Sequence, residues 1–192
     1  MVTRPPSPFE PAVTNLTAGQ RLYRVLSSTR TATEFNPGVG APTRFAFFGN
    51  PVVPVMYAAD TEEAAIAETL LHDIPADGGV LPYDQYAGKA LVRLEVTRAL
   101  SLAVDVTASP ASTYGETVAW AHAAHAAGLD GLVWMSRMCN DTKAYVVFGD
   151  RCTFEAFAQD PGHARIFASP ADQMWLIDLC APLHVDVLLE PA

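Results

Sequence analysis

The chain has few cysteines and no long hydrophobic run. Its three cysteines, Cys139, Cys152 and Cys180, are odd in number and widely spaced over 192 residues. Neither a disulfide framework nor a Cys/His zinc site fits this spacing. No apolar stretch approaches the roughly 20 residues of a membrane span, and the N-terminus lacks the apolar segment of a signal peptide. We therefore expect a soluble, cytoplasmic protein.

Positive charge is also scarce. The chain carries 12 lysines and arginines against 21 aspartates and glutamates, a formal net charge of -9. Such a surface repels nucleic acids and anionic membranes, so broad binding to either is not expected. Half of the residues are hydrophobic, which is enough for one sizeable core. Because cations are so few, the positions of the arginines indicate where a local basic pocket for a small phosphorylated ligand could lie.

The common catalytic motifs are missing as well. Neither a GxGxxG nor a GxxxxGK[ST] phosphate loop occurs, and GxSxG and HExxH are absent. No spaced pair of acidic residues stands out as the two catalytic carboxylates of a glycosidase. His122 and His125 lie three residues apart in a predicted helix without a third ligand, so we expect helix-surface or packing histidines and no metal site.

Apolar periodicity divides the chain into an arm and one domain. Residues 1–18 contain four prolines and predict an extended N-terminal arm, whereas residues 19–192 predict a single domain. Strands are expected near 20–26, 52–59, 90–97, 100–106, 132–135, 145–148, 165–168, 175–179 and 184–189, helices at 61–72, 115–127 and 154–158, and a loop over 74–89. Since strands and helices do not alternate regularly, we expect an α+β domain with largely antiparallel sheets.

The chain is organised around residues 55–73, where an apolar strand leads into a helix. Asp60 is expected to cap this helix, with Glu63 as the reciprocal partner of a capping box. At about 100° per residue, Glu68 falls within the apolar stripe of the helix. A carboxylate among apolar neighbours needs a cation, hydrogen-bond donors or a ligand opposite it. Glu68 is therefore either a functional residue or half of a structural ion pair.

Other polar side chains lie inside or at the ends of apolar segments: Arg24, Arg44, Tyr57, Ser136 and Arg137. Guanidinium forks bind phosphate oxygens, a tyrosine stacks on a flat ring, and a carboxylate holds ribose hydroxyls. Together these groups suit a dinucleotide. Taken singly, each also fits an ordinary role in an ion pair, in the core or at a strand end.

The ordered set of segments resembles the RES domain family, which is named for its arginine, glutamate and serine. The resemblance covers roughly residues 20–151 and rests on LYRV (22–25), FNPG (35–38), PTRF (42–45), VMYAADTEEAAIAETLLHD (55–73), TYGETVAWAHAAH (113–125) and DGLVWMSRM (130–138). By this resemblance the family residues correspond to Arg24, Arg44, Tyr57, Glu68 and Ser136. One departure is Pro42-Thr43, where many members have a Gly-Gly pair.

The resemblance implies a fold similar to ADP-ribosyltransferase toxins and an NAD-degrading enzyme. Such an enzyme cleaves the nicotinamide–ribose bond by phosphorolysis or hydrolysis, with NAD and inorganic phosphate as substrates and no cofactor. It also implies a bacterial toxin whose partner is a helix-turn-helix (Xre-type) antitoxin. A protein ADP-ribosyltransferase on the same fold and a non-catalytic binding module are the alternatives, and the acceptor and the oligomeric state stay open.

We assign each candidate residue a role in that reaction. Arg24 and Arg44 would hold the pyrophosphate or the inorganic phosphate, with Arg137 as a further candidate for the same anion. Tyr57 would pack against the nicotinamide ribose or ring. Glu68 would stabilise the positive charge of the ribosyl transition state, and Ser136 would hydrogen-bond nicotinamide or a phosphate.

Overall fold

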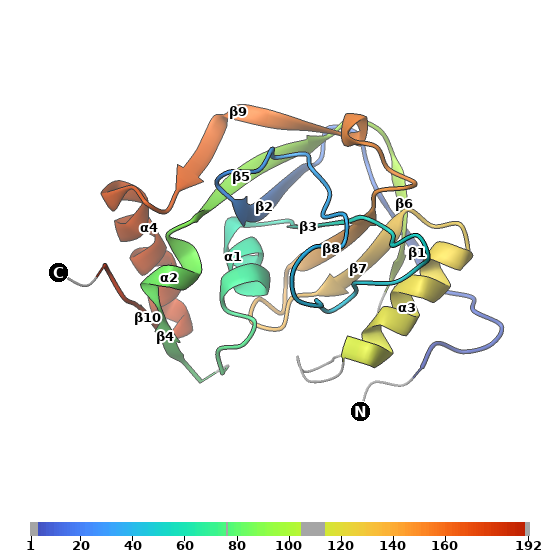
Figure 1. Cartoon of the computed structure of the whole chain (residues 1–192), viewed down its shortest axis with the longest axis horizontal. Coiled ribbons are helices and arrows are strands. Elements are labelled where there is room, and N and C mark those ends of the chain that lie inside the picture. Colours follow the sequence, from blue (N-terminus) through green and yellow to red (C-terminus); the bar gives the residue numbers. More distant parts are fainter. Residues whose placement is uncertain (1–3, 76, 105–113, 191–192) are drawn as a thin grey trace.

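An eight-stranded sheet forms the centre of the computed structural model, which describes residues 4–75, 77–104 and 114–190 (Figure 1). The strands follow the order β1-β6-β7-β8-β3-β2-β5-β9 across the sheet. Their bounds are β1 Val13–Leu16, β2 Arg21–Ser27, β3 Val55–Ala59, β5 Lys89–Val96, β6 Leu100–Val104, β7 Gly131–Met135, β8 Lys143–Phe148 and β9 Phe157–Ile166. Within this sheet, as described, β6 and β7 pair in parallel and the other neighbours are antiparallel.

The helices lie around this sheet, and a second, two-stranded sheet lies beside it. The bounds of these elements are α1 Glu62–Leu70, α2 Tyr83–Tyr86, α3 Tyr114–Ala126, α4 Pro170–Cys180, β4 Gly79–Leu81 and β10 Val185–Val187. In Figure 1, α2 and α4 flank the β4–β10 pair at one end of the molecule, while α3 lies at the opposite end. The expected α+β fold with largely antiparallel strands is confirmed.

Two hydrophobic cores lie on the two faces of the main sheet. Strand β8 shows how the sequence divides between them, because Val146 and Phe148 belong to the core that contains α1, while Tyr145 and Val147 belong to the other. Neighbouring side chains in a strand point to opposite faces. An all-apolar run such as β8 therefore predicts a strand covered on both sides.

The start of α1 differs from the prediction. Thr61 caps the helix, since its hydroxyl oxygen accepts a hydrogen bond from the Ala64 N–H at 3.2 Å. Asp60 instead accepts hydrogen bonds from the Tyr145 hydroxyl at 2.7 Å and from Gln20 Nε2 at 3.2 Å. The predicted capping by Asp60 is wrong because donors from distant strands take its carboxylate, and the next residue serves as the cap.

The segment 175–179 was predicted as a strand and lies in helix α4. Its apolar run is short enough to fit either element, so periodicity alone does not decide. The helix begins earlier, where the Ser169 hydroxyl accepts from the Asp172 N–H at 3.5 Å and Pro170 takes the first helical position. A proline is well suited to that position because its missing N–H would have no partner there.

The segment 74–89 was predicted as a loop, but it contains β4 and α2. Strand β4 pairs with β10, and Tyr86 of α2 is fully buried. The Tyr86 hydroxyl donates to the Leu188 carbonyl at 2.7 Å, across a separation of 102 residues. Such long-range partners leave no local pattern in the sequence.

The remaining segments follow the prediction more closely. Helix α3 ends at Ala126, and Gly128 follows with a φ of +85°, which suits a glycine that stops a helix. Strand β9 is longer than expected, and the predicted helix at 154–158 is a 3₁₀ turn over Phe154–Ala156. Residues 13–16, inside the predicted arm, pair as β1 with β6.

The described residues contain neither a metal-ligand cluster nor a membrane-spanning helix. They include no group of three or more His, Cys, Asp or Glu side chains that could hold a metal ion. His122 and His125 pack edge-on against the ring of Phe48, as expected of packing histidines. None of the helices described is both long and apolar enough to cross a membrane.

Candidate active site

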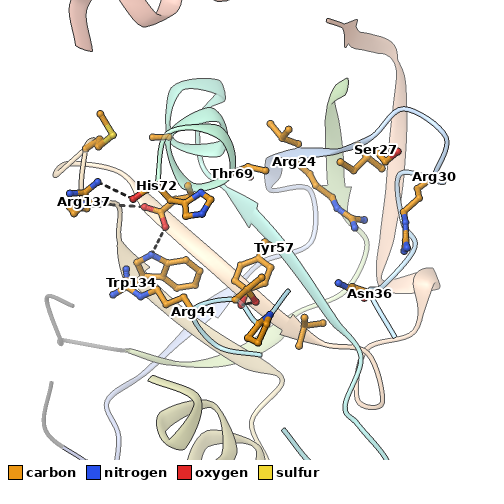
Figure 2. A pocket seen from close by; sticks show the side chains of 18 of the residues that line it. Arg24, Ser27, Arg30, Asn36, Arg44, Tyr57, Thr69, His72, Trp134 and Arg137 are labelled. Atoms are coloured by element: carbon orange, nitrogen blue, oxygen red, sulfur yellow. Dashed lines mark hydrogen bonds between the residues drawn. The ribbon is translucent and has the colours of Figure 1, made fainter. Parts of the chain in front are cut away.

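A cavity of about 400 Å³ opens between β2, β3, α1 and the end of β7. Its lining includes five of the six predicted site residues: Arg24, Arg44, Tyr57, Glu68 and Arg137. Figure 2 shows Arg24 and Arg30 at one end of the cavity and Arg44, Trp134 and Arg137 at the other, with Tyr57 between them. The cavity is therefore elongated, with cationic side chains toward both ends.

Glu68 is held by two donors from the end of β7. The indole Nε1 of Trp134 donates to Oε2 at 3.1 Å, and the backbone N–H of Arg137 donates to Oε1 at 3.3 Å. Each oxygen of the carboxylate thus has its own donor. These bonds explain how an acid on the apolar stripe of α1 is tolerated.

The end of β7 is tied to the end of α1 by Arg137. Its Nη2 donates to the carbonyl oxygens of His72 at 3.1 Å and Ile74 at 2.9 Å, just beyond the last turn of the helix. Carbonyl groups at a helix end need such outside donors. Arg137 therefore fixes the helix that carries Glu68, in addition to lining the cavity.

Ser136 is the one predicted site residue outside the cavity lining. It is fully buried, its backbone N–H donates to the Thr142 carbonyl at 2.9 Å, and its hydroxyl lies beside the Cys139 thiol. The chain turns at this point, between the two residues that donate to Glu68. The backbone N–H of Ser136 thus supports the turn, whereas its buried hydroxyl has no hydrogen-bond partner among the described residues.

Arg24 is a buried cation at the other end of the cavity. Only 8% of its surface is exposed, and its Nη1 donates to the Ala32 carbonyl at 2.6 Å. Burial lowers the pKa of Arg24 to about 10, an effect that the Glu34 carboxylate opposes and the Arg30 guanidinium reinforces. The group stays charged at neutral pH, so an anion in the cavity would offset the cost of burying it.

Tyr57 holds the loop that carries Arg44. Its hydroxyl is 2.9 Å from the Thr43 hydroxyl and accepts a hydrogen bond from the Phe45 N–H at 3.0 Å. On the other side, the Thr117 hydroxyl of α3 donates to the Arg44 carbonyl. The backbone around Arg44 is thereby fixed from both β3 and α3.

The Arg44 guanidinium lies against aromatic rings. Its central carbon is 5.2 Å from the centre of the Phe45 ring and 5.3 Å from the Trp134 ring. Both distances are within the range of cation–π attraction. The two aromatic rings therefore help to hold the Arg44 guanidinium at this end of the cavity.

The sequence analysis missed several residues that line the cavity. They are Arg30, Asn36, Thr43, His72 and Trp134. Trp134 could have been predicted from the sequence, because a tryptophan in a fully apolar strand needs a hydrogen-bond acceptor for its indole N–H. The loop residues gave none, since their positions depend on how the segment between β2 and β3 folds over the cavity.

Fold and site together define a class of protein: an α+β domain whose cavity combines cationic side chains with one oriented carboxylate. The family model of the RES domain matches residues 21–168. The chain therefore belongs to the RES domain family. No curated protein matches it.

A solved structure shares the fold. The chain is similar to one in the crystal structure of the M. tuberculosis MbcT–MbcA toxin–antitoxin complex, with a TM-score of 0.56. The similarity covers 83% of this chain and 90% of that one, at 15% sequence identity. At this level of identity the comparison demonstrates a common fold.

Proposed function

We propose that the protein degrades NAD by cleaving the bond between nicotinamide and ribose. The observation that carries this proposal is the Glu68 carboxylate, which two donors orient in a cavity with the buried cation Arg24 toward its other end. NAD offers a matching pair of groups, a pyrophosphate and a ribose that becomes positively charged in the transition state. Membership of the RES domain family supports the same substrate, because the resemblance implies NAD-consuming enzymes.

The residues of the cavity suit the two halves of this reaction. As nicotinamide leaves, positive charge develops on the ribose, and the Glu68 carboxylate would stabilise that charge. Arg24 and Arg44 would bind the pyrophosphate or an incoming inorganic phosphate, and Tyr57 would border the sugar. Phosphate or water then bonds to the anomeric carbon, while the electron pair of the broken bond leaves with nicotinamide. NAD is a substrate here, and the reaction needs no cofactor.

We further propose that the protein is the toxin of a toxin–antitoxin pair. Loss of NAD harms the cell that makes the enzyme, so its activity requires restraint. The M. tuberculosis toxin with the same fold was crystallised with its antitoxin. By the family resemblance, the partner of this chain would be a helix-turn-helix (Xre-type) protein. Residues 19–192 together with strand β1 would form the toxic domain, and the reaction would take place in the cytoplasm, where NAD is available.

The test is to incubate the purified protein with NAD, with and without inorganic phosphate, and to separate the products by chromatography. We expect nicotinamide release, and the second product identifies the acceptor. Glu68→Gln should lower turnover by about a hundredfold or more, because a neutral amide stabilises the ribosyl cation poorly. Glu63→Gln is the matched control, since Glu63 is exposed on the same helix and lies outside the cavity.

Two results would contradict the proposal. Full turnover by Glu68→Gln would remove Glu68 from the reaction. No consumption of NAD by folded protein under either condition would favour the protein ADP-ribosyltransferase or the binding module. Labelled NAD, offered together with a cell extract, would then separate these two, because only the transferase would label a protein.

A further inference from the structure

Trp134 contacts three of the proposed site residues at once. Its indole N–H donates to Glu68, and its ring lies 5.3 Å from the Arg44 guanidinium carbon. The same ring packs edge-on against Tyr57, with 6.1 Å between the ring centres. Trp134 is 3% exposed, although it lines the cavity. The buried ring thus connects the carboxylate with the loop that carries the second arginine.

We infer that Trp134 is a positioning residue of this enzyme, which sets the orientation of the Glu68 carboxylate and keeps Arg44 beside it. The inference rests on the proposed function, because it assumes that Glu68 acts on the substrate. Of the two donors to Glu68, only the indole belongs to a side chain. Without it, a single backbone N–H would hold a side chain with several rotatable bonds.

The indole can fulfil this role because its own position is fixed. Trp134 sits in β7, which is paired with β6 on one side and with β8 on the other. Its ring packs on Phe45 with the ring centres 4.7 Å apart, and Arg44 lies over it. A donor that cannot rotate away holds the carboxylate in one orientation before substrate arrives, which is the condition for electrostatic preorganisation.

Two substitutions separate the two roles of the ring. Trp134→Phe removes the N–H but retains an aromatic face for Arg44, so kcat should fall about tenfold to a hundredfold with little change in KM for NAD. Trp134→Leu removes the aromatic face as well, so KM should rise in addition. Trp175→Phe is the control, because Trp175 packs on Phe167 and Arg165, away from the cavity.

A positioning role and a merely structural role differ in what Trp134→Phe changes. The indole N–H holds the Glu68 carboxylate in one orientation. Its loss should therefore lower kcat, while KM for NAD and the urea denaturation midpoint stay close to those of the wild type. A variant that is only less well packed would lose stability, and its kcat and KM would change together.

An NMR measurement tests the contact without relying on turnover. The chain has three tryptophans, so the indole region of a ¹H–¹⁵N spectrum should contain three cross-peaks. The Trp134 cross-peak, assigned from its absence in Trp134→Phe or Trp134→Leu, should move upfield in Glu68→Ala.

The results separate this inference from the proposed function. If all three indole cross-peaks are the same in wild type and Glu68→Ala, the inference is overturned, even if neither tryptophan variant can be purified. Wild-type kcat in Trp134→Phe would overturn it as well. A Glu68-dependent cross-peak in a protein that leaves NAD intact would support the contact and refute the proposed function.

Discussion

Replacing Arg24 by methionine should abolish NAD cleavage and leave the stability of the fold nearly unchanged. Burial lowers the pKa of Arg24 from its usual value to about 10. At about 1.4 kcal/mol per pKa unit, keeping the charge in place at neutral pH costs the folded state about 3 kcal/mol. Methionine removes this cost and fills much of the same volume.

The substitution also removes a favourable contact. The Ala32 carbonyl would lose the donor that lies 2.6 Å away, which costs about 1 to 3 kcal/mol. The two effects oppose each other, so the free energy of unfolding should change by no more than about 2 kcal/mol. Because the pKa is lowered on folding, the charge penalty is complete below pH 10 and is relieved only as the pH rises through that value. A measurement at pH 7 therefore sees all of it.

Urea denaturation followed by tryptophan fluorescence measures the stability, and NAD consumption measures the function. Pyrophosphate should raise the denaturation midpoint of the wild type, because it binds only the folded state, and should not raise that of Arg24→Met. Arg21→Met is the matched control, since Arg21 is exposed on the same strand and should change the free energy of unfolding by about 0.5 kcal/mol or less.

A loss of more than about 3 kcal/mol of stability in Arg24→Met would mean that Arg24 is a structural cation whose partners outweigh its burial. Turnover of NAD by the variant at the wild-type rate would contradict the proposed role of Arg24 in the site. Equal stabilisation of the variant and the wild type by pyrophosphate would contradict it as well.

Two further substitutions test the supports of the site. Tyr57→Phe removes the acceptor of the Phe45 N–H, which should lower the free energy of unfolding by about 1 to 3 kcal/mol and raise KM for NAD. Tyr83→Phe is its control. An unchanged KM in Tyr57→Phe would contradict the role of Tyr57 in holding the loop that carries Arg44. Gly131→Ala places a methyl group 2.1 Å from the Val146 carbonyl oxygen in the centre of the sheet, which should cost at least about 2 kcal/mol by urea denaturation. Gly88→Ala meets no atom within 4 Å and should be neutral, so equal stabilities would refute the argument.

The sequence predicted those parts of the fold that depend on local pattern. Strand β5 was expected because apolar residues alternate along it, and helix α3 was expected because alanine dominates its sequence. Helix α4 was missed because a short apolar run fits both periods. The cap of α1 was misplaced by one residue because Tyr145, distant in sequence, takes the Asp60 carboxylate. Local rules fail where a distant partner competes for the same group.

The candidate site was predictable to a similar extent. Arg24 and Glu68 stood out because a charge inside an apolar segment needs an explanation. Ser136 has no such local signal, and its position outside the cavity lining follows from the turn that ends β7. Arg137 was expected to hold an anion, and the structure adds two carbonyl partners beyond α1 that no spacing in the sequence indicates.

The position of Glu68 depends on tertiary contacts at both ends of a short helix. A helix of nine residues, such as α1, is marginal by itself in water. Thr61 stabilises its first turn locally, whereas Arg137 fixes the chain beyond its last turn from a segment more than 60 residues away. The geometry of the carboxylate is therefore established only once β7 has joined the sheet. A substitution that disturbs β7 should weaken the orientation of Glu68 even where it contacts neither the helix nor the substrate.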